Sequence, residues 1–238
     1  MVIKILILLA ILLVAYSAFS YLRIRHYATN SPNPDIIQTS FTQGSGPALK
    51  YIAAGDSTAV GEGASVVENT YTVKIANELI KTNTVEYKNI AVRGAKTSDV
   101  INNQLQQIVE FQPNVITISI GANDATHLVA SKQVFANYQT IIQKLTSETK
   151  AKIYITNIAN FTGAKLLPWP VIKLYEYNSA KLNPKLLALE TDRVKIVNIH
   201  DFGWDKFPDR SVTYSLDLFH PSDAGYQNWA DAFLFKMH

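Results

Sequence analysis

Three side chains of this sequence could together carry out nucleophilic catalysis. Ser57 follows a short apolar run and a Gly-Asp pair, while Asp217 and His220 stand three residues apart near the C-terminus. A serine hydroxyl becomes a nucleophile when a histidine takes its proton, and a carboxylate can hold that histidine in the required tautomer. We therefore take Ser57, His220 and Asp217 as the candidate nucleophile, general base and orienting acid.

Each of these motifs also has a simpler explanation. Gly55-Asp56-Ser57 is typical of an ordinary turn after a strand, and the sequence has no Gly-x-Ser-x-Gly elbow and no phosphate-binding Gly-Lys-Ser/Thr. His220 precedes Pro221-Ser222-Asp223, which is typical of a helix start, so a capping or surface role suits it equally well. Both explanations stay open while each motif is considered by itself.

Two further motifs offer hydrogen-bond donors between the serine and the histidine. Asn123 follows the apolar run 115–120, and its side-chain amide can stabilise an oxyanion without being titrated. Gly94 follows the run 85–91, and its backbone N–H would be a second donor. A turn explains either motif equally well when it stands alone.

Apolar runs of strand length alternate with segments of helical pattern beyond residue 48, which predicts a parallel sheet covered on both faces. The carboxyl ends of such strands share one edge, where ligands usually bind, so Ser57 would lie there. The predicted strands are 49–53, 85–91, 115–120, 152–158 and 194–199. The predicted helices are 71–81, 98–111, 132–149, 172–189 and 223–236, and Pro184 should kink or divide the fourth.

In their order along the chain, the motifs of Ser57, Gly94, Asn123 and His220 resemble the four blocks of the GDSL esterase/lipase family, also called SGNH hydrolases. The resemblance implies an α/β fold: a three-layer α/β/α, flavodoxin-like SGNH-hydrolase fold with a five-stranded parallel sheet. It implies Ser57 as nucleophile and His220 as base and then acid, with Asp217 orienting the histidine. The backbone N–H groups of Ser57 and Gly94, with the Asn123 side chain, would form the oxyanion hole.

The activity implied by the resemblance is that of a serine esterase with an acyl-Ser57 intermediate and with no cofactor or metal. Thr58 stands where the family often has leucine, a variation that leaves the nucleophile untouched. Lipid esters such as lysophospholipids and O-acetyl groups on envelope glycans both suit as substrates. The apolar segment 161–170 could form an acyl-binding wall, contact a membrane or pack over the core. An acyltransferase and a non-catalytic binding module are the alternative functions.

The other histidines are interpreted as incidental. His127 follows the Asn123 motif and could line a cleft, but nothing in its spacing requires that. His200 and Asp201, even combined with His220, match no metal-ligand pattern. No cysteine is present, so disulfides, thiolate metal sites and a lipidated N-terminal cysteine are excluded.

The 238 residues, 47% of them hydrophobic, suit one domain behind a non-globular leader. Residues 5–22 carry no charge. The length of this apolar segment lies between that of a membrane-spanning helix and that of the core of a signal peptide. We expect an uncleaved membrane anchor within 1–27, with a cleavable signal peptide as the alternative. The polar residues 28–47 predict a flexible linker, and 48–238 the hydrolase domain. The domain would then be extracytoplasmic, or secreted after cleavage.

The net charge of +3 originates in the leader rather than in the domain. Setting aside Lys4, Arg23 and Arg25 leaves 19 basic and 19 acidic residues. A neutral domain has no electrostatic reason to bind nucleic acid, so the expected partners are an ester substrate and, through the leader, a membrane. The sequence does not indicate an oligomeric state.

Overall fold

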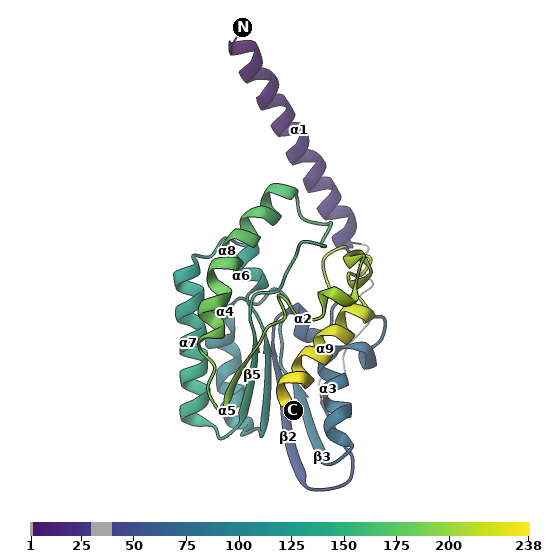
Figure 1. Ribbon diagram of the computed structural model, residues 1–238, viewed down its shortest axis with the longest axis vertical. Coiled ribbons are helices and arrows are strands. Elements are labelled where there is room, and N and C mark those ends of the chain that lie inside the picture. Colours follow the sequence, from purple (N-terminus) through teal and green to yellow (C-terminus); the bar gives the residue numbers. More distant parts are fainter. Residues whose placement is uncertain (1, 30–39) are drawn as a thin grey trace.

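A computed structural model of the chain describes residues 2–29 and 40–238. The N-terminal part is a single helix, α1 (Val2–Thr29), which projects away from the rest of the molecule (Figure 1). Large apolar side chains along it are exposed, among them Leu13 and Phe19. Within the described residues, no helix combines the length and the apolar character that crossing a membrane requires.

The membrane-spanning anchor predicted for residues 1–27 therefore finds no support in the helices that the structure describes. The linker predicted for 28–47 lies partly outside the described residues, because 30–39 are not among them. Its last part is ordered, since Ser40–Gln43 forms a strand, β1. The domain thus begins before residue 48, where the sequence analysis placed its boundary.

A six-stranded sheet in the order β1-β3-β2-β4-β5-β6 forms the centre of the domain. The five strands expected from the sequence are parallel to one another. Their order is that of flavodoxin-like folds, in which the second strand lies on one side of the first and all later strands lie on the other. They are β2 (Ala48–Gly55), β3 (Thr84–Asn89), β4 (Val115–Ser119), β5 (Lys152–Thr156) and β6 (Val194–Val197).

The prediction of five strands was one too few. The additional strand, β1, is antiparallel to β3, and Phe41 lies opposite Tyr87. It is a four-residue edge strand whose side chains are mostly exposed, so its sequence Ser-Phe-Thr-Gln carries little of the apolar pattern on which the prediction depended. The sheet is therefore mixed, while the three-layer α/β/α architecture is as predicted.

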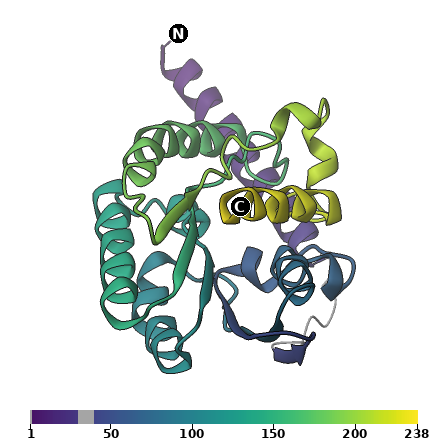
Figure 2. The ribbon, with the colours of Figure 1, turned by 60° about the horizontal axis from the view of Figure 1, so that its bottom comes forward.

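Helices cover both faces of the sheet, as the turned view shows (Figure 2). One face is covered by α5 (Leu105–Phe111), α7 (Ser131–Glu148) and α8 (Trp169–Leu187), and the other by α3 (Tyr71–Ile80) and α9 (Asp223–Met237). Strand β2 shows why both faces are apolar: Ile52 and Ala54 join the first core, and Tyr51 and Ala53 the second. Alternate side chains of a strand point to opposite faces, so a doubly covered strand must be apolar throughout. The shorter helices are α2 (Ser57–Val60), η1 (Val67–Asn69), α4 (Thr97–Asp99), the π-helical η2 (Val100–Gln104), α6 (Ala122–Thr126), η3 (Trp204–Lys206) and η4 (Arg210–Thr213).

Pro184 does not divide helix α8, which runs uninterrupted from Trp169 to Leu187. The proline stands in the last turn, and its carbonyl oxygen still accepts a hydrogen bond from the backbone N–H of Ala188. A proline costs most in the middle of a helix, where it removes an internal hydrogen bond and crowds the preceding turn. Because Pro184 lies in the last turn of α8, its cost is not large enough to end the helix there.

The strand order places a ligand-binding edge between β2 and β4. Connections leave these two neighbouring strands toward opposite sides of the sheet, which opens a crevice beyond their carboxyl ends. Helix α2 begins directly after β2 and α6 directly after β4, and both lie at this end of the sheet (Figure 1). Ser57 and Asn123 are therefore brought to the same edge by topology, although 66 positions separate them in the sequence.

Candidate active site

Ser57 is the first residue of α2 and owes its position to the glycine that ends β2. Gly55 has a φ of 125°, and a Cβ atom at this position would lie 1.9 Å from the carbonyl oxygen of Ser119 on β4. Only glycine fits such a close approach. Asp56 then caps α2, because its carboxylate accepts a hydrogen bond from the backbone N–H of Thr58 at 2.9 Å.

The end of β2 is also held by a side chain that the sequence analysis did not identify. Gln104, at the end of η2, donates to the Gly55 carbonyl oxygen at 2.9 Å and accepts from the Gly55 N–H at 2.8 Å. Its side chain is buried. The π-helical turn of η2 gives this residue its place, and such turns often occur at functional sites. The nucleophile therefore follows a backbone segment that is fixed from two sides.

Ser57, His220 and Asp217 form one chain of hydrogen bonds. The Oγ atom of Ser57 lies 2.9 Å from Nε2 of His220, and Nδ1 of His220 lies 2.6 Å from Oδ2 of Asp217. Because the carboxylate accepts the proton of Nδ1, Nε2 is left as the acceptor for the serine hydroxyl. The structure brings together the three residues that the sequence analysis proposed as nucleophile, base and orienting acid.

Asp217 is fixed by its own neighbours. Its Oδ1 atom accepts hydrogen bonds from the Ser215 hydroxyl at 2.7 Å and from the backbone N–H groups of Phe219 and His220, each at 2.9 Å. Leu218 has a φ of 62°, and this left-handed residue allows the carboxylate to fold back onto the histidine three residues later. Burial raises the pKa of Asp217, but the hydrogen bonds and the nearby His220 outweigh it and hold that pKa well below its usual value. Asp217 is thus a permanent anion at neutral pH.

Negative charge surrounds His220. Burial by itself lowers its pKa, but the hydrogen bond to Asp217 and the charges of Glu62, Asp217 and Asp56 raise the pKa above its ordinary 6.5. The imidazolium is therefore stabilised in this site, as a base that must accept and return a proton requires. Glu62 approaches from the loop after α2, with its Oε2 atom 3.6 Å from Nε2.

The two predicted oxyanion donors have different positions. Asn123 lies in α6, lines the cavity beside Ser57, and donates one side-chain N–H to the carbonyl oxygen of Ala95 at 3.0 Å. Gly94 lies in the loop after β3, with a φ of 74°, and lines a separate surface hollow. That loop is tied to the site because the Val92 N–H donates to Gly55 and Ala95 accepts from Asn123. The contribution of Gly94 to an oxyanion hole stays a prediction.

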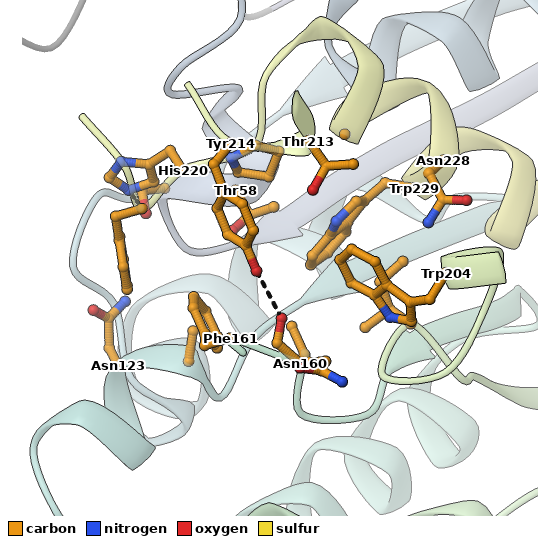
Figure 3. Close-up of a pocket in the computed structure, with 17 residues that line it drawn as sticks. Thr58, Asn123, Asn160, Phe161, Trp204, Thr213, Tyr214, His220, Asn228 and Trp229 are labelled. Atoms are coloured by element: carbon orange, nitrogen blue, oxygen red, sulfur yellow. Dashed lines mark hydrogen bonds between the residues drawn. The ribbon is translucent and has the colours of Figure 1, made fainter. Parts of the chain in front are cut away.

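Ser57 and His220 line a cavity of about 580 Å³, a volume that includes the solvent at its opening. From His220 the cavity extends toward Trp229 of α9 (Figure 3). Its far end is formed by the indole rings of Trp204 and Trp229 together with Asn228. None of the described residues that line it is an Asp, Glu, Lys or Arg. Its wall is largely aromatic and aliphatic, and includes Ala159, Phe161, Ile199, Trp204, Tyr214, Phe219 and Trp229.

Residues 53–227, which is most of the chain, match the GDSL-like lipase/acylhydrolase family. The chain belongs to this family. Its four motifs lie within the matched residues, and the neighbours in fold and sequence are lipases and esterases. This GDSL hydrolase is accordingly a carboxylic ester hydrolase.

The spore germination lipase LipC of Bacillus licheniformis is 25% identical over 205 residues, covering 75% of this chain and 92% of that protein. The lipase Lip_vut3 from a goat rumen metagenome has a TM-score of 0.60 at 25% identity, over 79% of this chain and 96% of that one. The acetylxylan esterase Axe2 of Geobacillus stearothermophilus has a TM-score of 0.62 over 82% and 96% of the two chains. At 16% identity, the likeness to Axe2 concerns the fold alone.

The apolar segment 161–170 contributes to the GDSL hydrolase site at its first residue and is exposed at Trp169. Phe161 is buried, stacks on Phe219 with 5.0 Å between ring centroids, and contacts Tyr175 edge-on at 4.7 Å. Phe161 lines the cavity and also belongs to the buried core, so an acyl-binding wall and packing over the core both stay open for this segment. Trp169, by contrast, is 68% exposed at the start of α8.

The two other candidate histidines lie outside the cavity lining. Nδ1 of His127 donates a hydrogen bond to the carbonyl oxygen of Asn123, 2.8 Å away, and so supports the α6 turn. His200 pairs with Asp201 at 2.6 Å and its carbonyl oxygen accepts from the Trp204 indole. In the part of the chain that the structure describes, no group of three or more potential ligands is arranged to hold a metal.

Several functional residues of this GDSL hydrolase were missed by the sequence analysis. Ser215 and Gln104 carry no motif and become visible only through their contacts with Asp217 and Gly55. Glu62 was a detectable case, because it stands in a Gly-Glu-Gly tripeptide five residues after the nucleophile. An acid between two glycines directly after a catalytic turn can be expected to lie near the site.

Proposed function

We propose that this protein hydrolyses carboxylic esters through an acyl-Ser57 intermediate. The observation that carries the proposal is the unbroken chain from the Ser57 hydroxyl through the His220 imidazole to the Asp217 carboxylate, with distances of 2.9 and 2.6 Å. A serine that is activated in this way and lines a cavity is positioned to attack a bound ester carbonyl.

In the acylation step, Ser57 Oγ forms a bond to the ester carbonyl carbon while its proton moves to Nε2 of His220. The imidazolium then gives that proton to the leaving alcohol as the C–O bond breaks. In the second step water attacks the acyl-enzyme, His220 takes its proton, and the acid departs as the proton returns to Ser57. Asp217 stays ionised throughout and stabilises the imidazolium formed in each step.

When Ser57 attacks the ester, the carbonyl oxygen of the substrate becomes negatively charged and needs hydrogen-bond donors at this edge of the sheet. An amide side chain has two N–H groups, and one of those of Asn123 is used by Ala95, so the other is available for the oxyanion. The backbone N–H of Ser57, at the start of α2, and that of Gly94 would complete the set. All three donors are uncharged, so the oxyanion hole would not titrate with pH.

The cavity favours an ester whose buried part is uncharged and apolar. Among the described residues that form its wall, none brings a carboxylate or ammonium to pair with a charged substrate group. Lipases among the relatives at 25% identity support an acyl-lipid ester, such as a lysophospholipid or another lipid ester, as the substrate class. The indoles of Trp204 and Trp229, which line the same cavity as Asn228, also suit a sugar ring, so acetylated glycans are the second candidate.

A substrate panel tests the reaction and the substrate together. Hydrolysis rates are measured on esters from acetyl to long-chain acyl, on acetylated glycans and on lysophospholipids, with Ser57→Ala as the blank. We expect Ser57-dependent turnover that rises with chain length beyond acetyl. A sharp preference for acetyl would favour the glycan ester, and fluorophosphonate labelling that persists in Ser57→Ala would refute the nucleophile. Addition of alcohol or sugar acceptors detects acyl transfer through the same intermediate.

We also propose that α1 holds the domain at a membrane, with the catalytic domain on the extracytoplasmic side. The exposed apolar side chains of α1, including Ile11, Leu13 and Phe19, support this proposal, because such a surface is unfavourable in water. Arg23 and Lys165 connect the end of α1 to the loop after β5 through a hydrogen bond. Fractionation of cells and protease treatment of intact cells test the location and the side.

A further inference from the structure

Glu62 brings a second carboxylate to the catalytic histidine. Its Oε2 atom lies 3.6 Å from Nε2 of His220, on the opposite side of the ring from Asp217, and 3.5 Å from Nε of Arg93. The Glu62 side chain is only 17% exposed, so water does not fully screen its charge. The esterase mechanism described above gives this residue no part.

Two glycines hold Glu62 in this place. Gly61 ends α2 with a φ of 101°, and Gly63 follows with a φ of 93°. A Cβ atom on Gly63 would lie 2.6 Å from the carbonyl oxygen of Pro221, so this loop packs directly against the histidine loop. The carbonyl oxygen of Glu62 also accepts a hydrogen bond from the Tyr226 hydroxyl at 2.7 Å. The carboxylate is thus aimed at His220 by a fixed backbone.

We propose that Glu62 is a positioning residue that acts through His220: its carboxylate stabilises the imidazolium that forms when Nε2 takes the proton of Ser57, and Arg93 moderates that effect. This inference rests on the proposed function. The distances from Nε2 of His220 distinguish the two contacts. The 2.9 Å to Ser57 is a hydrogen-bond distance, whereas the 3.6 Å to Glu62 is too long for a hydrogen bond. Ser57 keeps the directional contact with Nε2, and Glu62 contributes charge.

The charged groups around His220 come from four segments. Asp217 lies on its own loop, Asp56 and Glu62 flank α2, and Arg93 follows β3. Asp56 is buried and committed to the N–H of Thr58, so it acts on the histidine from farther away. Glu62 is therefore the acid nearest to Nε2 among the described residues, and it is the one whose charge Arg93 can offset.

Substitutions at Glu62 and Arg93 should move the pH profile in opposite directions. Glu62→Gln removes a negative charge beside Nε2, so the pKa of His220 falls and the acidic limb of kcat/KM moves to lower pH by roughly one unit. The plateau value should fall about three- to tenfold, because a weaker base accepts the serine proton less readily. Arg93→Gln leaves Glu62 unopposed, so the limb should move to higher pH by about half a unit.

Two further variants separate this electrostatic role from a structural one. Arg93→Lys keeps the positive charge and should restore the limb of the native protein. The double variant Glu62→Gln/Arg93→Gln should have the same acidic limb as Glu62→Gln alone, because the effect of Arg93 on His220 is to offset the charge of Glu62. A purely structural ion pair would instead lower the plateau in both single variants and leave the limb in place.

A titration that needs no turnover keeps this inference distinct from the proposed function. In full-length Ser57→Ala protein, the ring proton signals of the five histidines are followed against pH by NMR, and His220→Gln identifies the relevant one. Adding Glu62→Gln should lower the His220 midpoint, and adding Arg93→Gln should raise it. Unchanged midpoints would overturn the role of Glu62 even if ester hydrolysis by Ser57 holds. Shifted midpoints, together with the absence of Ser57-dependent ester hydrolysis by the native protein, would support the electrostatic contact and refute the proposed reaction.

Discussion

At the scale of single residues, Asn123 has one side-chain N–H committed to Ala95 and one directed to no acceptor among the described residues. We expect Asn123→Ala to lower kcat about 10²- to 10³-fold with little change in KM, as for other oxyanion donors. Steady-state kinetics on a water-soluble ester provide the measurement. Asn102→Ala, at an exposed position, is the matched control, and an equal effect of both substitutions would exclude an oxyanion role.

Asp56 makes a prediction about pH and stability. Burial raises its pKa from 3.8 to about 6, although the hydrogen bonds from Thr58 oppose that rise. A carboxyl whose pKa is higher in the folded state binds its proton more tightly there, so its contribution to stability falls as pH rises from about 4 to about 6. Asp56→Asn removes this charge but keeps an oxygen that can accept from Thr58.

We therefore expect Asp56→Asn to be more stable than the native protein at pH 8, by about 2 kcal/mol, and to differ little from it at pH 4. The contribution of Asp217 to stability depends on pH in the opposite direction, because its pKa is lowered in the folded state and the stability that it adds is lost as pH falls. The difference between the two proteins isolates Asp56, since both contain Asp217. Urea unfolding at several pH values measures it, with the exposed Asp192→Asn as the control. A constant difference across that range would contradict the assignment.

At the scale of elements, the end of β2 depends on Gln104. Replacement of Gln104 by methionine leaves the N–H of Gly55 buried without its acceptor, while the carbonyl oxygen keeps its bond from Val92. We expect a loss of about 1 to 3 kcal/mol in the free energy of unfolding. Gln107→Met, exposed on α5, controls for the substitution itself. If the two variants unfold at the same urea concentration, Gln104 does not stabilise the strand end.

The main elements could be predicted from the sequence because each has a strong apolar pattern. The buried strand β4 is apolar or β-branched up to its last residue, Ser119, and α7 shows helical spacing, so both were found close to their observed bounds. Strand β1 was not found, since an exposed edge strand of Ser-Phe-Thr-Gln gains its stability from pairing with β3, which no local pattern reveals. Pro184 was given too much weight because its cost depends on its place in the helix.

At the scale of the whole molecule, the cavity could not be predicted although its catalytic end could. Ser57, Asn123 and His220 stand in recognisable motifs at the ends of elements, so their meeting follows from strand order. Trp204 and Trp229 come from η3 and α9, and nothing in their sequence surroundings indicates that they meet at the far end of one cavity. Substrate choice depends on such long-range packing, whereas reaction class depends on local motifs.

The arrangement of α1 relative to the domain leads to the last prediction. The hollow between them is formed by Tyr16 and Phe19 of α1 with Leu167 of the loop before α8 and Trp169 at the start of α8, while the triad lies wholly within the domain. Removal of residues 1–29 should therefore leave kcat/KM on a water-soluble ester within about twofold, because distant sites act independently. Hydrolysis of the same acyl group presented in lipid vesicles should fall at least about tenfold, since the exposed apolar surface of α1 is lost.

Rates on the two forms of the ester, measured with equal amounts of full-length and shortened protein, provide the comparison. Co-sedimentation with the vesicles reports binding separately from turnover, and Ser57→Ala in the full-length chain supplies a blank that still binds. If the shortened protein hydrolyses vesicle esters as fast as the full chain does, α1 does not deliver the domain to its substrate. A loss on both forms of ester would instead mean that α1 supports the loop after β5, of which Phe161 forms part of the cavity wall.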